Sequence, residues 1–323
     1  MIQLSPNQIV PQLIADGTTP IADAITRHQA GLLANVGGQN ARGVAPGLTP
    51  DQTRVWGQIL YTAKAHSASS GAAPYDANTY GLVAGVDIVG SPHLNFGSAL
   101  GWVEIDSSGR GQVSGSRTNL NSFQLAGYFT WTPGNPQEAG LSLDGQVGVG
   151  YNRFQEDRRI DFLGQKATAD FDGQHYNASL RVSYNLPLSA TTWLTPFVDL
   201  HEVRVSNAGY SETGAGSANL HILKKTYDSF GQEIGLRAST DIANSLGRFR
   251  PSMKLGWEHN YANKSPSIRA VLGSITFDST APREANDGAS LELGLGFTRD
   301  DRVVIDLQYE GEVRQNSTNQ SAS

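Results

Sequence analysis

Residues 140–152, GLSLDGQVGVGYN, alternate between apolar and polar side chains over most of their length. Because successive side chains of a β-strand point to opposite faces, this period of two predicts an amphipathic strand. One face carries Leu141, Leu143, Val147, Val149 and Tyr151, and the other carries Ser142, Asp144, Gln146 and Asn152. The same alternation recurs at 176–186, 249–259, 290–298 and 303–310. The chain is therefore expected to be all-β.

Eleven strands of this kind can be read between Arg54 and Arg314, and their connections alternate strictly between long and short. Long connections are expected at about 67–76, 107–116, 159–168, 206–224 and 263–286. Short ones are expected at about 89–93, 133–139, 187–191, 242–246 and 299–301. A transmembrane β-barrel explains the alternation, because its short turns face the periplasm and its long loops face outward. A soluble sandwich gives no reason for placing every long connection on one side.

Strand length and aromatic placement also favour an antiparallel transmembrane β-barrel. The expected strands have about 12–18 residues, whereas strands of globular proteins usually have five or six. Aromatic side chains recur near strand ends, where a membrane interface places them. They are Trp131, Tyr151, Tyr184, Trp193 and Tyr309.

An odd number of strands would leave one edge with unpaired backbone groups in lipid, so a twelfth strand is expected. Residues 315–323, QNSTNQSAS, are polar and do not alternate. We therefore expect them to occupy the place of an outward-facing loop. The twelfth strand should be missing beyond Ser323, which makes the barrel C-terminally truncated.

The first 53 residues do not alternate, and one segment of them predicts a helix over 20–36. Thr19 suits the N-cap, Pro20 the first helical position, and Gly37-Gly38 the end. Such a helix would be about 25 Å long, close to the height of the apolar band of a barrel. Two interpretations stay open: a small periplasmic cap, or a helix that threads the pore.

Composition excludes several classes of function. The net charge is −6 and no basic stripe is present, so nucleic-acid binding is not expected. Hydrophobic residues make up 38% and charged residues 17%, values that suit a surface divided between lipid and a polar lumen. No apolar run approaches the roughly 18 residues of a spanning helix. The start, MIQLSP, lacks a signal peptide, so we expect the true N-terminus to lie in a larger precursor.

No catalytic, cofactor or metal site is predicted. The chain has no Gly-x-Ser-x-Gly elbow, no His-Glu-x-x-His and no cysteine. Asp172 and His175 have an Asp-x-x-His spacing, but they lie in an alternating strand. Gly214-Ala215-Gly216-Ser217 opens no helix, so phosphate binding is not expected there.

The polar faces of the strands predict a charged lumen. The inward set is Asp144, Arg181, Glu233, Arg237, Arg250, Lys254, Glu258, Glu292, Asp306 and Glu310. Arg27 and His28 on the helix are expected partners for its acidic members. Cross-strand ion pairs that water reaches contribute little each, so any one residue is more often a solvated lining. As a set, they predict a hydrated interior that holds the helix and lets a polar, unfolded chain pass.

Several short motifs resemble those of autotransporter β-domains, the translocators of type V secretion. They are the helix, Trp56-Gly57-Gln58, residues 80–87 (YGLVAGVD) and residues 309–312 (YEGE). Residues 209–212 (GYSE), 228–229 (DS) and 235–237 (GLR) are similar to those of members that carry GDSL-type esterases. The resemblance implies a monomeric 12-stranded barrel in the bacterial outer membrane with the helix in its pore. It also implies insertion by the barrel-assembly machinery and export of an N-terminal passenger to the cell surface.

The resemblance implies a division into 1–19 (end of the passenger or linker), 20–53 (pore helix and linker) and 54–323 (barrel). The chain departs from the family by ending at Ser323 without a terminal aromatic residue. It also lacks the adjacent asparagines at which some members cut themselves, since Val36 follows Asn35 and Ala41 follows Asn40. A small outer-membrane porin and a soluble all-β binding domain remain as alternatives. An esterase could only be a passenger upstream.

Overall fold

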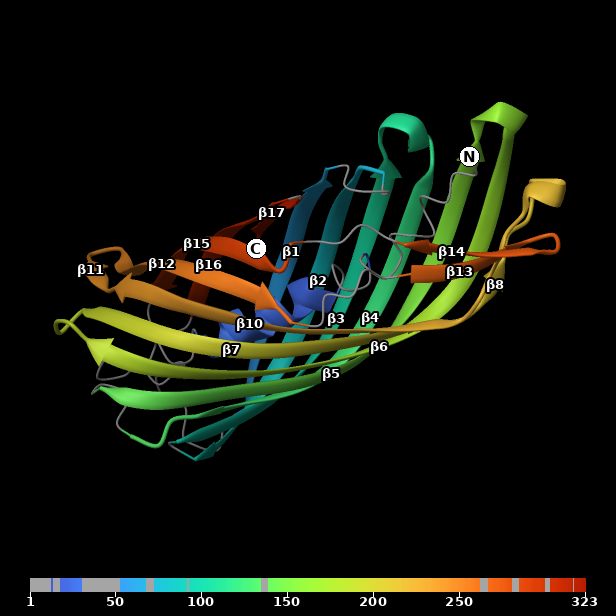
Figure 1. The fold of residues 1–323 in the computed structure, drawn as a ribbon. Coiled ribbons are helices and arrows are strands. Elements are labelled where there is room, and N and C mark those ends of the chain that lie inside the picture. The colour runs from blue at the N-terminus through green and yellow to red at the C-terminus, as the bar shows by residue number, and fades with distance from the viewer. Residues whose placement is uncertain are drawn as a thin grey trace.

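The barrel consists of twelve antiparallel strands (Figure 1). The structure is a computed structural model that describes residues 13, 18–30, 53–67, 73–91, 93–134, 139–261, 267–280, 285–299, 303–315 and 317–323. The first seven barrel strands are β1 (Thr53–His66), β2 (Tyr75–Ser91), β3 (Leu94–Gly109), β4 (Arg117–Trp131), β5 (Gly140–Ile160), β6 (Gln165–Pro187) and β7 (Thr192–Asn207). The other five are β10 (Lys225–Thr240), β12 (Gly247–Asn260), β15 (Asp287–Arg299), β16 (Val303–Arg314) and β17 (Ser317–Ala322). The predicted antiparallel barrel is confirmed.

The twelfth strand lies inside the chain, so the prediction that it is missing was wrong. β17 pairs with β16 from Arg314↔Ser317 to Tyr309↔Ala322, and with β1 from His66↔Ser317 to Tyr61↔Ala322. Because ladder hydrogen bonds come from the backbone, a polar segment pairs as well as an apolar one. The polar outward residues of β17 hid this strand from the period-two pattern.

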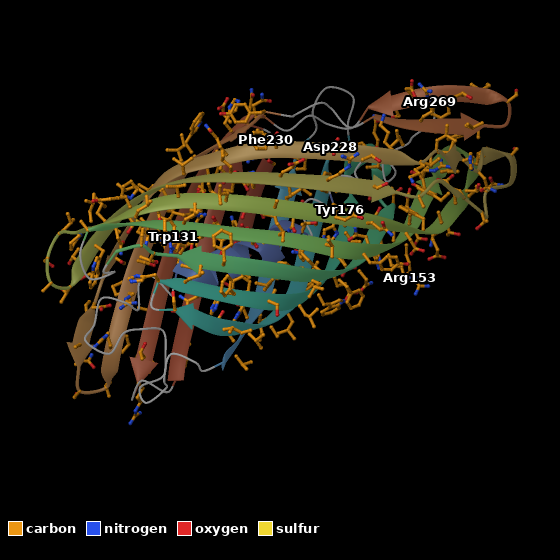
Figure 2. All side chains as sticks on the ribbon, turned by 90° about the horizontal axis from the view of Figure 1, so that it is seen from below. Trp131, Arg153, Tyr176, Asp228, Phe230 and Arg269 are labelled. Atoms are coloured by element: carbon orange, nitrogen blue, oxygen red, sulfur yellow. The ribbon has the colours of Figure 1, made fainter. Side chains whose placement is uncertain are left out.

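Side chains alternate across the wall as expected for a barrel that faces lipid. On β5, Val147 is 64% exposed on the outer surface, while Asp144 and Gln146 are buried inside. Trp131, Tyr176 and Arg153 follow one another on the outer surface from the short-turn end towards the long-loop end (Figure 2). Among the described helical residues, no segment is long and apolar enough to cross a membrane.

Beyond this apolar band the outer face becomes polar, and large apolar side chains appear on the inner face. On β5 the outward residues are apolar up to Tyr151 and polar from Arg153 onward. Phe154 of β5 and Phe171 of β6 are buried on the inner face, which also holds the buried charges of Glu156 and Arg158. Residues 107–109, 159–160 and 165–168, expected in long loops, therefore continue the strands. They end in the short 3-10 turns η2 (Gly111–Val113) and η3 (Asp161–Leu163).

The two longest connections build a second, smaller sheet at the long-loop end. It contains β8 (Tyr210–Ser211), β9 (His221–Ile222), β13 (Ser267–Leu272) and β14 (Ile275–Thr280). The turn η4 (Gly216–Ala218) joins β8 to β9, and β11 (Ile242–Asn244) pairs with β12 at the other end of the barrel. In Figure 1 the β13–β14 hairpin lies beside the long extensions of the strands.

A helix over residues 18–30 lies inside the barrel (Figure 1). Thr18 and Thr19 are already helical, so Thr19 is not the N-cap that the sequence predicted. The predicted end at Gly37-Gly38 lies outside the described residues. Ile21 and Ile25 are fully buried against Leu60, Val83, Ala99, Val103, Ala126 and Tyr128 of the wall. The pore interpretation is therefore correct for the described part of the helix.

Candidate functional site

The helix lies against one side of the lumen and leaves a cavity on the other. Its apolar face packs on β1–β4, and Gly101 of β3 allows this close approach. A Cβ atom at Gly101 would lie 2.8 Å from Ile21, closer than carbon atoms can approach. The opposite face of the helix borders a cavity of about 320 Å³ lined by Asp23, Thr26 and Arg27 together with residues of the remaining wall.

A network of charged side chains crosses the wall of this cavity, with Lys254 of β12 at its centre. Lys254 Nζ lies 2.8 Å from Glu310 Oε1, 3.0 Å from Glu233 Oε1 and 3.9 Å from Glu292 Oε2. Ser290 donates a hydrogen bond of 2.8 Å to Glu233. The carboxylates come from three different strands, so one ammonium group ties β10, β15 and β16 to β12.

Two arginines extend the network. Arg237 Nη2 lies 3.0 Å from Glu292 Oε1. Arg181 donates from Nε to Asp199 Oδ2 at 3.1 Å, and its Nη2 lies 3.6 Å from Glu233 Oε2. All of these side chains are largely buried in the wall. Buried charges are costly unless paired, and every charge of the network has an opposite partner within 4 Å.

The helix joins the network through Arg27. Its Nη1 lies 3.3 Å from Glu310 Oε2, and Glu310 also binds Lys254. The sequence predicted Arg27 as a partner of the acidic lumen residues, and Glu310 is one of those residues. Gln146 of β5 adds hydrogen bonds from Nε2 to Ala22 O at 3.0 Å and to Thr26 Oγ1 at 2.8 Å.

His28 binds a carboxylate that is not among the acidic residues of the predicted lumen set. Its Nε2 lies 2.9 and 3.0 Å from the two oxygens of Asp87 on β2, and its ring stacks on Trp56 at 4.3 Å. Tyr128 donates to Asp87 Oδ1 at 2.5 Å and accepts from Trp56 Nε1 at 2.7 Å. We call Trp56, Asp87 and Tyr128 the aromatic cradle of His28.

Gln29 fixes the next position of the helix against backbone carbonyl groups. Its Nε2 donates to Phe129 O at 2.7 Å and to Gly145 O at 3.3 Å. Phe129 lies near the end of β4 and Gly145 near the start of β5, next to the short connection between these strands. The C-terminal part of the described helix therefore points towards the short-turn end.

Four residues of the predicted lumen set lie outside the central network. Arg250 binds Asp241 at 2.8 Å near the short-turn end, and Asp144 accepts a hydrogen bond of 2.7 Å from Thr130. Glu258 pairs with Arg314, which also binds Glu312. Asp306 takes part in no ion pair found among the described residues. The six others, Arg181, Glu233, Arg237, Lys254, Glu292 and Glu310, form one connected group.

The sequence pattern marks the site residues that the interpretation missed. Asp87 is a charged residue at an inward position of β2, in the part of the strand where the outward residues from Tyr80 to Ile88 are apolar or aromatic. Trp56 and Tyr128 are aromatic residues on the lumen face, which the pattern of alternation assigns to polar side chains. Asp199 lies directly opposite Arg181 in the ladder between β6 and β7. Register between strands, which one sequence does not give, was needed to bring these groups together.

The structure separates the two residues of the Asp-x-x-His spacing. Asp172 is exposed on the outer face of β6, while His175 is buried on the inner face between Asn152 and Gln124. An odd spacing in a strand places two residues on opposite faces, so they cannot form a catalytic pair. No group of three or more metal-binding side chains occurs among the described residues.

Comparison with known proteins gives a consistent set of similarities. The model of the family described as "Autotransporter beta-domain" matches residues 55–310. Outer membrane protein B of Rickettsia japonica is 24% identical over 271 residues, covering 82% of this chain and 16% of the relative. The extracellular serine protease of Serratia marcescens is 24% identical over 294 residues, covering 88% and 27%. The chain therefore spans about a sixth to a quarter of the length of these relatives.

Two solved translocator structures share the fold. The translocator domain of the autotransporter NalP from Neisseria meningitidis superposes with a TM-score of 0.67 at 13% identity, covering 96% of each chain. The transport unit of AIDA-I from Escherichia coli gives a TM-score of 0.64 at 14% identity, covering 91% of this chain and 96% of that one.

Proposed function

Because the chain belongs to the autotransporter β-domain family, we propose that its charged lumen and pore helix guide and then hold the chain that it exports. The family resemblance predicted from the sequence is confirmed, and with it the location in the bacterial outer membrane and the role of translocator domain. The porin and soluble-domain interpretations are set aside. The narrower resemblance to esterase-carrying members stays a prediction.

The direction of the helix supports this proposal most strongly. Gln29 binds backbone groups next to a short turn, so the helix ends towards the periplasm. Leu13, which precedes the helix, is buried among residues of the long-loop end. Leu13 therefore lies towards the cell-surface end and Gln29 towards the periplasmic end. This polarity is the one that export of an N-terminal passenger requires.

The chemistry of the lumen suits a route for a polar, extended chain. An unfolded segment carries backbone N–H and C=O groups that cost free energy if they are buried without partners. The cavity beside the helix offers carboxylate, guanidinium and amide groups from several strands. Because these groups pair with one another when the route is empty, they remain stabilised before and after passage.

The partners follow from the same proposal. An N-terminal passenger, lipid of the outer membrane and the barrel-assembly machinery would be the contacts of the whole protein, with the barrel acting as a monomer. The translocator itself carries out no chemical conversion in this scheme, and the chemistry of the passenger belongs to the preceding part of the protein. The contacts of the pore helix then seal the lumen once export is complete.

Surface labelling of the passenger tests the proposal. We expect Lys254→Gln in the full-length protein to slow the appearance of antibody-accessible passenger on intact cells, because it leaves Glu233, Glu292 and Glu310 without their shared cation. Lys166→Gln is the matched control, since Lys166 is exposed and pairs with Asp157 outside the apolar band. Lys254→Arg, which keeps the positive charge, should restore most of the rate.

Wild-type display by the Lys254→Gln variant, with the barrel still folded, would show that the lumen network has no part in export.

A further inference from the structure

Leu13 is one of the most deeply buried side chains of the protein. It is helical, and it packs on residues of the strand extensions rather than on the part of the wall that holds residues 18–30. It has no exposed surface. Its neighbours form a core at the cell-surface end, made by Tyr75, Ala77, Ile105, Leu120, Phe154, Ala169, Phe171, Val205, Tyr210, Leu220, Ile222, Ile268 and Ala270. We call this group the surface core. It is separate from the apolar contacts of the pore helix, which involve a different set of residues.

The surface core is closed from two sides. Phe154, Phe171 and Tyr210 stack as a column, with ring centroids 4.7 and 3.8 Å apart and interplanar angles of 7° and 1°. These rings come from the strand extensions and from β8. Ile268 and Ala270 of β13 belong to the small sheet and complete the enclosure.

A buried ion pair fixes the wall that the small sheet contributes. Arg158 of β5 donates from Nε to Glu212 Oε1 at 2.7 Å, and its Nη2 donates to Ala218 O at 2.9 Å. Glu212 also accepts from the backbone N–H of Leu220 at 2.8 Å. Because these groups lie in the segment from β8 to β9, that segment is held on β5 whether or not an apolar side chain fills the core.

We propose that the surface core is a binding site for one apolar side chain of the exported segment, and that Leu13 is its occupant. The inference rests on the proposed direction of export. The site would accept a side chain of the size of leucine and hold the segment at the cell-surface end, independently of the pore helix. The exported chain is then fixed at two levels, by Leu13 outside the apolar band and by Arg27, His28 and Gln29 within it.

The two attachments have different physical characters. Those of the helix combine the apolar contacts of Ile21 and Ile25 with ion pairs and hydrogen bonds of Arg27, His28 and Gln29. That of Leu13 is the exclusion of an apolar side chain from water, which does not depend on charge or salt. Backward movement of the chain into the pore must remove Leu13 from the core. The surface core therefore acts as a latch on the segment between the passenger and the helix.

Thiol labelling of the full-length protein in isolated outer membranes tests the latch. The 323 residues contain no cysteine, so an introduced thiol is the only one in this part of the protein, and labelling is measured on the peptide that carries it. Ala270→Cys reports on the surface core and Ala24→Cys on the helix, and both alanines are fully buried. We expect Leu13→Asp to accelerate labelling at position 270 by about 100-fold or more, as expected for loss of a buried leucine. Labelling at position 24 should be unchanged.

Matched variants keep the result interpretable. Leu163→Asp makes the same exchange at the exposed tip of the β5–β6 hairpin and should leave both reporters protected. Leu13→Met preserves apolar volume and should change the rate by less than about 10-fold. If aspartate blocks assembly, Leu13→Ala replaces it as the test, because it removes only apolar volume. It should also accelerate labelling at position 270 and leave labelling at position 24 unchanged.

Continued protection of position 270 in Leu13→Asp or Leu13→Ala would overturn the latch, because the core would then close without its occupant. Equal acceleration at positions 270 and 24 in a folded barrel would overturn its independence from the helix. Neither measurement requires a displayed passenger. A protein that protects position 270 but shows no passenger on cells would therefore reject the export route and leave the binding site in place.

Discussion

Replacing Gly97 by alanine should destabilise the barrel through the aromatic cradle of His28. A Cβ atom at Gly97 of β3 would lie 2.0 Å from Cζ and 2.3 Å from the hydroxyl oxygen of Tyr128. Such distances are impossible, so the ring must move. The hydroxyl that moves with it holds Asp87 and accepts from Trp56, and Asp87 in turn binds His28.

The size of the effect follows from three contributions. Overpacking a fitted site costs about 1–3 kcal/mol. Loss of the hydrogen bond to the Asp87 carboxylate adds about 1.5–3 kcal/mol. Exchange of glycine for alanine also reduces the conformational entropy of the unfolded chain, which stabilises the folded state by about 0.4–1 kcal/mol and partly offsets these losses. The expected net loss in the free energy of unfolding is about 2–5 kcal/mol.

Gly127→Ala is the matched control, because a Cβ atom at Gly127 of the neighbouring strand β4 would meet nothing within 4 Å. Urea unfolding of both variants in lipid vesicles, followed by tryptophan fluorescence, measures the difference. We expect Gly127→Ala to be neutral or slightly stabilising. Free energies of unfolding that agree within about 0.5 kcal/mol would refute the steric reasoning, since the exchange itself is identical.

The remaining predictions concern lipid contact, pH and the pore. Leu293→Arg, on the outer face of β15, should cost about 2–4 kcal/mol in the same unfolding measurement if it lies near the midplane; an unchanged value would mean that the outer face does not contact lipid. Burial, with a smaller contribution from Glu212, raises the pKa of Glu156 to about 8 from its ordinary 4.5; Glu156 lies five residues beyond Tyr151, outside the apolar band. Because the folded state holds this proton more tightly, stability should fall as pH rises from 4.5 to about 8. Glu156→Gln should abolish this loss of stability, measured as the free energy of opening of β8 from amide hydrogen exchange. A loss that persists in the variant would show that another group causes it. Asp87→Asn should raise ion conductance in planar bilayers by weakening the hold on the helix, whereas conductance equal to that of wild type would show that the cradle is not needed to keep the pore filled.

The barrel was predictable because lipid and lumen impose opposite chemistry on alternate residues. Where that constraint holds, as on residues 141–151, the alternation of the sequence predicts the strand correctly. Where it ceases, the interpretation failed. β17 has polar residues facing outward and was assigned to a loop. The ends of the extensions of β5 and β6, residues 159–160 and 165–168, were also assigned to a loop, and there the outward residues are polar. Both errors come from treating apolar-outward alternation as the only signature of a strand.

The candidate site was predictable in content but not in arrangement. Inward positions gave the members of the charged network, since only parity along each strand was needed. Which groups meet depends on register and on the depth of the helix, and neither is written in one sequence. His28 illustrates this, because a partner among the acidic residues of the predicted lumen set was expected, and Asp87 of β2, which is not in that set, is the partner found.

The change of polarity along β5 and β6 has a consequence for how the cell-surface part can change in length. Odd and even positions keep their sides through the border of the apolar band, and only the chemistry of each side changes. Adding two residues beyond the border of each strand would raise the hairpin by about 6.6 Å and leave every side chain on its side of the wall. Adding one would turn the buried rings outward together with Glu156 and Arg158, and the exposed polar residues inward. The height of the hairpin above the membrane can therefore vary only in steps of two residues per strand.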